Sequence, residues 1–183
     1  MHRSSMATDS ALSLIDLSAL PRAGIKGKDL SPWIDAKGYE IGITANRAYP
    51  QHDGVLVARL SPAELMLFSN PLDPAPGAIT NSLAQTYKCY AVRRQDSHYW
   101  FALTGACSPA MFAKLCGVDL SPDNFADHAV AQTFVARASA VIVRHDLDGT
   151  LCYYLLGDSS TIRYMWTCLI DAMNEFDGQV LAL

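Results

Sequence analysis

The chain has 183 residues, of which 50% are hydrophobic and only 17% are charged, so its composition excludes intrinsic disorder and its length is enough for one domain with a substantial core. Its 14 basic and 18 acidic residues give a net charge of −4, which excludes the basic surface of a nucleic-acid-binding protein. A chain so poor in charge either has a large core or exposes apolar surface that a partner covers.

The N-terminal segment lacks the features of a membrane anchor or a signal peptide. No stretch approaches the roughly 18 consecutive apolar residues of a membrane span, and the apolar patch at 11–20 has no basic flank leading to a cleavage site. Residues 1–13 are mostly small and polar, so we expect a flexible N-terminal arm. Residues 14–183 are then expected to form a single domain.

Four Ser-Pro dipeptides predict helix starts. Serine can accept hydrogen bonds from the first free N–H groups of a helix, and proline at the first helical position loses no hydrogen bond there. The dipeptides begin at Ser31, Ser61, Ser108 and Ser121. The second is followed by Glu64, which can reach back to the Ser61 amide and complete a capping box.

Apolar runs between these dipeptides predict strands. We expect a hairpin from 89–92 and 99–103, on either side of a polar stretch. The loop at 71–77 contains three prolines and leads into a predicted helix in which Ile79, Leu83 and Tyr87 align. Further strands are predicted at 54–60, 132–138, 141–143 and 151–156, the last two joined by an Asp148-Gly149 turn.

The last predicted helix has the clearest pattern. Seven apolar residues between Ile162 and Phe176 recur at helical spacing, with Asp158 or Ser159 as the cap and Gly178 as the stop. Strands and helices alternate without a regular βαβ rhythm. We therefore predict an α+β fold with antiparallel or mixed sheets and packed helices.

The five cysteines are odd in number and none belongs to a C-x-x-C pair. This usage favours buried free thiols in a reducing compartment over disulfides or a zinc site. We therefore expect a cytoplasmic protein without a metal site. The histidines are isolated in sequence, with His52 and His98 in predicted turns and His128 after Asp127 in a predicted loop, so local motifs show no catalytic group.

Two motifs suggest enzymes but suit structural roles better. The segment from Asp146 to Thr150 copies the D-x-D-G-T nucleophile motif of haloacid-dehalogenase-type phosphatases, yet too few residues follow it for the remaining strands of that fold, which favours a hairpin turn. Gly157-Asp158-Ser159 is similar to the start of a GDS-type esterase. A serine nucleophile needs a histidine base and none follows His145, so a helix cap is the better interpretation.

Several passages taken in order support a family resemblance. They are 16–27, 53–64, the stretch 103–110 followed by Leu115-Cys116-Gly117-Val118-Asp119-Leu120, 131–133 and 158–166. Together they resemble the folate-binding domain of aminomethyltransferases (glycine cleavage T-protein-like), and the central passages resemble the small gamma subunit of heterotetrameric sarcosine oxidase. This resemblance extends from about Asp16 to Phe176.

The resemblance implies a function as well as a fold. It implies a non-catalytic gamma-type subunit without a cofactor of its own, which packs against larger flavoprotein and folate-domain subunits or associates with itself. Aminomethyltransferases carry an acid near the folate amine, whereas the matching stretch at 54–58 has no carboxylate. The apolar tail at 180–183 is expected to contribute to the surface that partners cover.

The alternative implied by the same resemblance is a stand-alone tetrahydrofolate-binding protein. Arg59 or Arg94 would then meet the glutamate tail of the ligand, because arginine forms paired hydrogen bonds with carboxylates. Asn70, which closes the second strand–helix passage, is the third candidate residue. No catalytic residue is predicted in either case.

Overall fold

The computed structural model describes residues 10–72 and 88–182. These residues form two compact units: the first takes the residues up to Ser18 and from His98 onward, and the second takes those from Ala19 to Ser97. The chain thus leaves the first unit after its first strand and returns to it for the next one. The sequence had led us to expect a single domain from residue 14.

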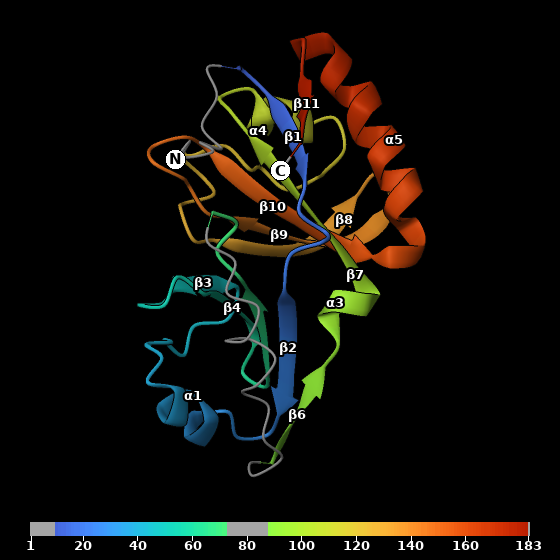
Figure 1. Ribbon diagram of the computed structural model, residues 1–183. Helices are drawn as coiled ribbons and strands as arrows, with labels where there is room; N and C mark the ends of the chain where they lie inside the picture. Colours follow the sequence, from blue (N-terminus) through green and yellow to red (C-terminus); the bar gives the residue numbers. More distant parts are fainter. Residues whose placement is uncertain (1–9, 73–87, 183) are drawn as a thin grey trace. The chain divides into compact units, whose positions relative to one another are not determined.

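The first unit is built on a six-stranded sheet in the order β11-β1-β7-β10-β9-β8 (Figure 1). All neighbouring strands are antiparallel except β1 and β11, which are parallel. Its strands are β1 (Ser13–Asp16), β7 (His98–Thr104), β8 (Val130–Val135), β9 (Ala138–Arg144), β10 (Cys152–Asp158) and β11 (Gln179–Leu181). Its helices are α4 (Ser108–Phe112), the 3-10 helix η1 (Ser159–Thr161), α5 (Ile162–Met173) and the 3-10 helix η2 (Asn174–Phe176).

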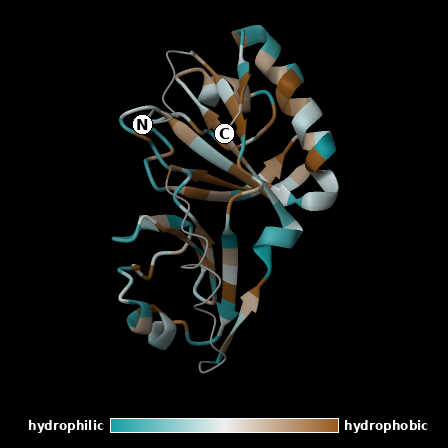
Figure 2. Ribbon diagram, viewed as in Figure 1, coloured by the Kyte–Doolittle hydropathy of each residue, from teal (hydrophilic) through white to brown (hydrophobic). Residues whose placement is uncertain are grey.

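One face of this sheet packs on α5. Met165, Leu169 and Met173 are buried on the helix, in the same core as Tyr153 and Leu155 of β10. Burying a side chain such as Leu155 contributes about 1.5–3 kcal/mol to folding. In Figure 2, hydrophobic and hydrophilic bands alternate along α5, as expected for a helix with one apolar face. The helix predicted from the apolar spacing is therefore confirmed.

The second unit contains a five-stranded antiparallel sheet in the order β3-β4-β5-β2-β6. The strands are β2 (Arg22–Gly27), β3 (Arg47–Pro50), β4 (Leu56–Ser61), β5 (Glu64–Phe68) and β6 (Cys89–Val92), with helices α1 (Ser31–Lys37) and α3 (Arg94–Ser97). Trp33 and Ile34 of α1 belong to the same buried cluster as Ile25, Val57 and Leu65 of the sheet. Both units fit the predicted α+β class.

Two of the four Ser-Pro dipeptides begin helices, at α1 and α4. In both, the serine is the first helical residue, and the cap positions are held by Leu30 and Cys107, neither of which makes a side-chain cap hydrogen bond. The predicted role of serine as the cap is therefore wrong, and proline lies at the second helical position rather than at the first.

The helix predicted after Ser61 is wrong. Ser61 ends β4 and pairs with Glu64, which begins β5, so the dipeptide forms a tight hairpin turn. The four residues from Leu65 to Phe68 are all buried, and β5 lies between β2 and β4 in the sheet. A continuous apolar run suits such a central strand, because both of its faces can be buried. At Ser121 the chain makes only a turn, in which Asp119 accepts the Ser121 N–H at 2.9 Å.

The hairpin predicted from 89–92 and 99–103 is also wrong. Both segments are strands, but β6 pairs with β2 and β7 pairs with β1 and β10, in different sheets. The local pattern identifies a strand but not the strand beside it. Strands β9 and β10 overlap the predicted ones, and the Asp148-Gly149 turn joins them as expected. The strand predicted at 132–138 overlaps β8 but runs past its end at Val135 into a turn, where Ala136 and Arg137 have positive φ.

The N-terminal arm predicted at 1–13 includes two residues that are part of the folded unit. Leu12 and Ser13 are both fully buried, and Ser13 begins β1, so these two residues belong to the folded unit. Residues 1–9, the predicted helix at 79–87 and most of the loop at 71–77 lie outside the described residues. All five cysteines are free thiols, of which Cys116 and Cys152 are buried.

Candidate binding groove

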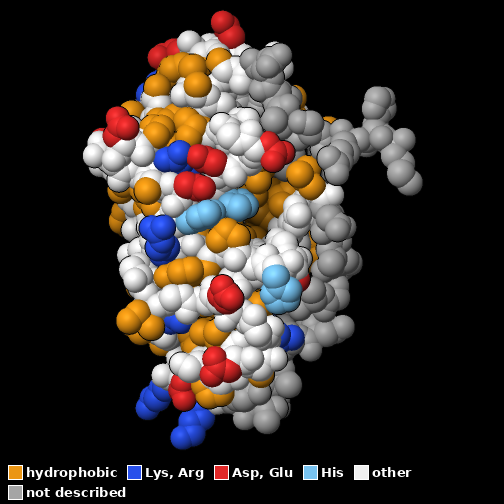
Figure 3. All heavy atoms as spheres, turned by 90° about the vertical axis from the view of Figure 1, so that its left-hand side faces the viewer, with side chains coloured by type: hydrophobic (Ala, Val, Ile, Leu, Met, Phe, Trp, Pro, Cys, Tyr) orange, Lys and Arg blue, Asp and Glu red, His pale blue; other side chains and the backbone are white. Residues whose placement is uncertain are grey.

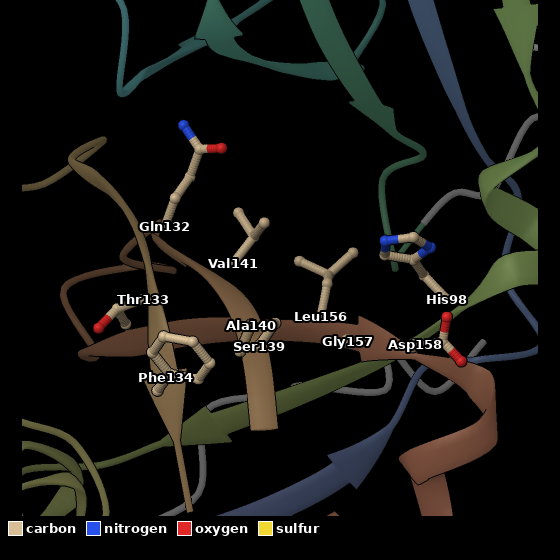
Figure 4. Close-up of a pocket in the computed structure, with 10 residues that line it drawn as sticks. All are labelled: His98, Gln132, Thr133, Phe134, Ser139, Ala140, Val141, Leu156, Gly157 and Asp158. Carbon is tan, nitrogen blue, oxygen red and sulfur yellow. The ribbon is translucent and has the colours of Figure 1, made fainter. Parts of the chain in front are cut away.

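A groove of about 440 Å³ lies on the face of β8–β9–β10 opposite α5 (Figure 4). The strand register places Gln132, Val141 and Leu156 directly beside one another across the three strands. Because side chains alternate between the faces of a sheet, these three side chains share one face, and Figure 4 shows them projecting to the same side.

The groove combines an apolar floor with polar groups around it. Val141 and Leu156 form the floor, and Phe134 on the outer strand β8 is 63% exposed. Gln132 adds an amide and Ser139 a hydroxyl. An apolar surface with a few polar groups is typical of a binding site for a ligand or a partner.

One end of the groove is anionic. His98 and Asp158 lie opposite each other in the β7–β10 register, and both line the groove. Asp158 accepts the backbone N–H of Ser160 at 2.8 Å. Hydrogen bonds from Ser160 lower the pKa of the Asp158 carboxyl, and the charge of His98 lowers it further. The carboxylate therefore stays ionised at neutral pH and favours a cationic or hydrogen-bond-donating group.

A second hollow lies beside α5 in the same unit. It has a volume of about 340 Å³ and is lined by residues of β1, β7 and α5, among them Phe101 and Trp166. The rings of these two residues meet edge to face with their centroids 5.2 Å apart, an arrangement that stabilises the packing of helix on sheet.

The three candidate folate residues do not converge on one site. Arg94 pairs with Glu64, which also pairs with Lys26 at 3.1 Å. Asn70 lies beyond the opposite end of β5, six residues from Glu64, which corresponds to about 20 Å of extended chain. The structure therefore separates Asn70 from Arg94.

Arg59 differs from the other two candidates. It is buried in β4, opposite Leu65, with 7% of its surface exposed. Its Nη1 donates to the carbonyl oxygen of Pro62 at 3.3 Å, while its Nε is buried without a hydrogen-bond partner among the described residues. Asn70, in contrast, uses its side-chain oxygen to accept the Leu72 N–H at 2.9 Å.

The two enzyme-like motifs have structural roles. Leu147 and Thr150 exchange backbone hydrogen bonds of 3.0 and 2.9 Å around Asp148 and Gly149, both of which have positive φ, so the phosphatase-like segment is a tight turn. In the esterase-like segment, Asp158 caps η1 through its hydrogen bond with Ser160. The interpretations as a turn and a helix cap are confirmed.

The groove cannot be recognised in the sequence pattern. Gln132, Val141 and Leu156 belong to three different strands, and the pattern of each strand alone contains no sign of their proximity. The only local signal was Phe134, an aromatic residue in a strand whose neighbours at 132 and 133 are polar.

The comparisons with known proteins concern the fold. No protein-family model and no curated protein matches the sequence. Among solved structures, the chain is similar to the heterotetrameric sarcosine oxidase from Corynebacterium sp. U-96 in complex with pyrrole 2-carboxylate. The TM-score is 0.76 at 20% identity, and the match covers 93% of this chain and 87% of that chain.

A second similar structure is the glycine cleavage system aminomethyltransferase T from Bartonella henselae. Its TM-score is 0.68 at 15% identity, and the match covers 94% of this chain but 48% of that one. The chain thus spans about half the length of the aminomethyltransferase. It has the aminomethyltransferase-like α+β fold that its sequence predicted. No helix among the described residues is long and apolar enough to cross a membrane.

Proposed function

We propose that this protein is a non-catalytic, gamma-type subunit of a heterotetrameric sarcosine oxidase-like oxidoreductase. The observation that carries the proposal is the similarity to a chain of a heterotetrameric sarcosine oxidase over nearly the whole length of both chains. The aminomethyltransferase, in contrast, is matched over only half its length. A subunit that serves the complex structurally needs the fold but no catalytic group.

The residues of the second unit support a non-catalytic role. The stretch at 54–58, which would carry the acid of an aminomethyltransferase, leads into β4, where Leu56, Val57 and Ala58 are buried apolar residues. The nearby carboxylate of Asp53 binds the Tyr39 hydroxyl at 3.0 Å and the Val55 N–H at 3.1 Å. It is therefore engaged in holding the turn that precedes β4.

Exposed apolar side chains support a role as a subunit. Phe134 and Tyr90 are 63% and 66% exposed, and they lie on β8 and β6, each an edge strand of its sheet. Edge strands with exposed apolar residues are sites of further association unless something covers them. We infer that larger subunits of the oxidase cover at least one of these two side chains.

Purification from the native host tests this proposal. The tagged chain is recovered at low salt and examined for stoichiometric flavoprotein subunits and for flavin reduction on addition of sarcosine or related N-methyl amines. We expect both. Recovery of a stable monomer without flavoprotein, at the same expression level as the partner subunits, would contradict the proposal.

Tetrahydrofolate binding is the second function that we propose, because of Arg59. Its buried Nε, without a partner among the described residues, is a donor that a ligand carboxylate would satisfy. Titration of tetrahydrofolate against tryptophan fluorescence should show a saturable change, with Trp33 as a buried reporter in the same unit. Arg59→Gln should weaken binding. Arg93→Gln, at an exposed position, is the control and should not. A flat titration up to high micromolar ligand would contradict this function.

A further inference from the structure

Two histidine rings lie close together at the ends of β8 and β9. The centroids of His128 and His145 are 5.4 Å apart, and Figure 3 shows two neighbouring histidine side chains at the surface, close to acidic and basic side chains. Asp127 completes the group, with its Oδ2 at 3.6 Å from His128 Nε2. One oxygen or nitrogen of each residue lies within 4.8 Å of the other two, and all three residues are half-buried.

Backbone hydrogen bonds hold the three residues in place. The His128 N–H donates to the carbonyl oxygen of Arg144 at 3.0 Å, which sets the loop beside the end of β9. Asp127 Oδ1 accepts the backbone N–H groups of His128 at 2.9 Å and Asp146 at 3.0 Å. Because Oδ1 is engaged in this way, Oδ2 remains as the oxygen that faces the imidazole of His128.

Among the described residues, Asp127 forms no ion pair with a lysine or an arginine, although the charge of Arg144 acts on it from nearby. Asp146 accepts two hydrogen bonds from the Arg144 guanidinium, at 3.0 Å from Nε and 2.6 Å from Nη2, so each compensates the other. The Asp127 carboxylate adds one negative charge beside two imidazoles. A divalent cation would balance this negative charge, whereas a neutral ligand would not.

His145 has a bonding position that the described residues do not fill. Its Nδ1 is buried and has no hydrogen-bond partner among them, whereas buried polar atoms are normally partnered. The ring is held in place by packing against Tyr154, with centroids 5.8 Å apart. An imidazole fixed in this way is well prepared to bind a ligand.

The donor set matches the preferences of first-row transition metals. Two imidazole nitrogens and one carboxylate oxygen are typical ligands of Zn²⁺ sites that keep a further position for water. With bonds of about 2.0–2.2 Å, the ligand atoms of a tetrahedral zinc site lie about 3.3–3.5 Å apart. The 3.6 Å between Asp127 and His128 is close to that spacing, and the three ligand atoms, which lie within 4.8 Å of one another, would draw closer together around a bound ion.

We propose that Asp127, His128 and His145 form a binding site for a divalent transition-metal ion such as Zn²⁺. The ion would join the loop that contains Asp127 and His128 to the end of β9. This role is independent of the gamma-type function proposed above. Metal binding would explain why two imidazoles that repel each other when both are protonated lie so close together.

Isothermal titration of Zn²⁺ into the untagged, chelator-treated full-length protein tests the site, together with the visible absorption spectrum of the Co²⁺ form. We expect one equivalent of bound metal and Co²⁺ bands typical of a four- or five-coordinate site. His128→Asn and His145→Gln should each weaken Zn²⁺ binding at least about 100-fold, the upper end of the loss seen when only an outer partner of a ligand is removed. Asparagine is chosen at 128 because the φ there is 64°, a conformation that asparagine tolerates.

His52→Asn is the matched control, because His52 is an exposed histidine outside the cluster, and it should bind Zn²⁺ like the wild type. Circular dichroism checks the fold of each variant, and Asp127→Asn replaces His145→Gln if the latter does not fold. The proposal is overturned if the wild type shows no saturable one-equivalent binding. It is equally overturned if folded variants of the cluster bind as tightly as His52→Asn.

Discussion

The guanidinium of Arg144 holds together separate segments of the first unit. It donates to the carbonyl oxygens of Phe125 at 2.7 Å and Pro122 at 3.3 Å and forms a two-fold hydrogen bond with Asp146. Its side chain is 9% exposed, and the hydrogen bond to Asp146 raises the pKa of this already permanently charged group. A planar fork of five donors fits this arrangement, and the single ammonium of lysine does not.

Arg144→Met should therefore destabilise the protein by about 3 kcal/mol, because it leaves the Asp146 carboxylate and two carbonyl oxygens without their donor. Urea unfolding in the presence of a chelator measures the change. Arg93→Met is the control: Arg93 is 88% exposed, its ion pair with Asp96 is 3.9 Å long, and the expected change is within about 0.5 kcal/mol. Equal effects of the two substitutions would contradict the role given to Arg144.

Cys152 shows a second effect of burial on a single residue. It is fully buried in β10, and burial raises the pKa of its thiol far above the usual value, with the charges of Asp146 and Asp127 as smaller causes. The thiol therefore stays protonated when the pH rises above about 8.5, where an ordinary cysteine ionises.

Alkylation of the native protein between pH 7 and 9 should consequently modify Cys168, which is half-buried, well before Cys152. Peptide mass spectrometry measures the order of labelling. Cys152 should react only as fast as the protein unfolds. Labelling of both thiols at the same rate in folded protein would show that β10 is more accessible than its burial implies.

At the scale of elements, Gly105 controls how the chain leaves β7. Its φ is 106°, and a Cβ added there would lie 2.5 Å from the carbonyl oxygen of Ala11. The Gly105 N–H donates to the carbonyl oxygen of Leu151 at 3.0 Å, and the Cys107 N–H donates to the carbonyl oxygen of Ala11 at 2.9 Å. The turn between β7 and α4 thus packs directly on the residues that precede β1.

Gly105→Ala should cost at least about 2 kcal/mol of folding free energy, from the positive φ and the backbone clash together. Gly117→Ala is the matched control, because a Cβ there would meet nothing within 4 Å. Its effect should stay within about 0.5 kcal/mol. Urea midpoints of the two variants measure the difference, and a Gly105→Ala variant as stable as Gly117→Ala would be evidence against this tight packing.

At the scale of the whole molecule, the shortage of charge has two sources. Both units have dense cores, among them the continuous buried run from Cys152 to Gly157. Other apolar residues remain at the surface: Phe134, Tyr90 and Val180 are more than half exposed and lie on β8, β6 and β11, which are edge strands of the two sheets. The apolar tail is therefore in part an edge strand, paired with β1.

If Phe134 contacts a partner subunit, Phe134→Asp should remove the flavoprotein from the purified complex while leaving the free chain about as stable as before, because the side chain contributes little to the core. Ile43→Asp, at a position that is 91% exposed, controls for the added charge and should leave the complex intact. Size-exclusion chromatography and thermal unfolding measure the two effects. An unchanged complex would exclude Phe134 from the interface.

The sequence by itself determined the features that depend on neighbours along the chain. The spacing of apolar residues gave α5 and its buried face, Asp148-Gly149 gave the turn between β9 and β10, and Asp158 gave the cap before α5. A few passages in the right order were enough to indicate the fold family, because the resemblance depends on the order of the elements along the chain and not on any single contact. Local chemistry is sufficient for the helix, the turn and the cap, whereas the fold family came from the resemblance.

Only the tertiary structure decided which strands pair and which side chains meet. Ser61-Pro62 has the signals of a helix start, yet the apolar run after it is stabilised more by burial between two strands than by a local cap. His128 and His145 are 17 positions apart, and the groove draws on separate strands. Sheet register creates these contacts through hydrogen bonds between distant segments, and a local pattern carries no information about the partner strand.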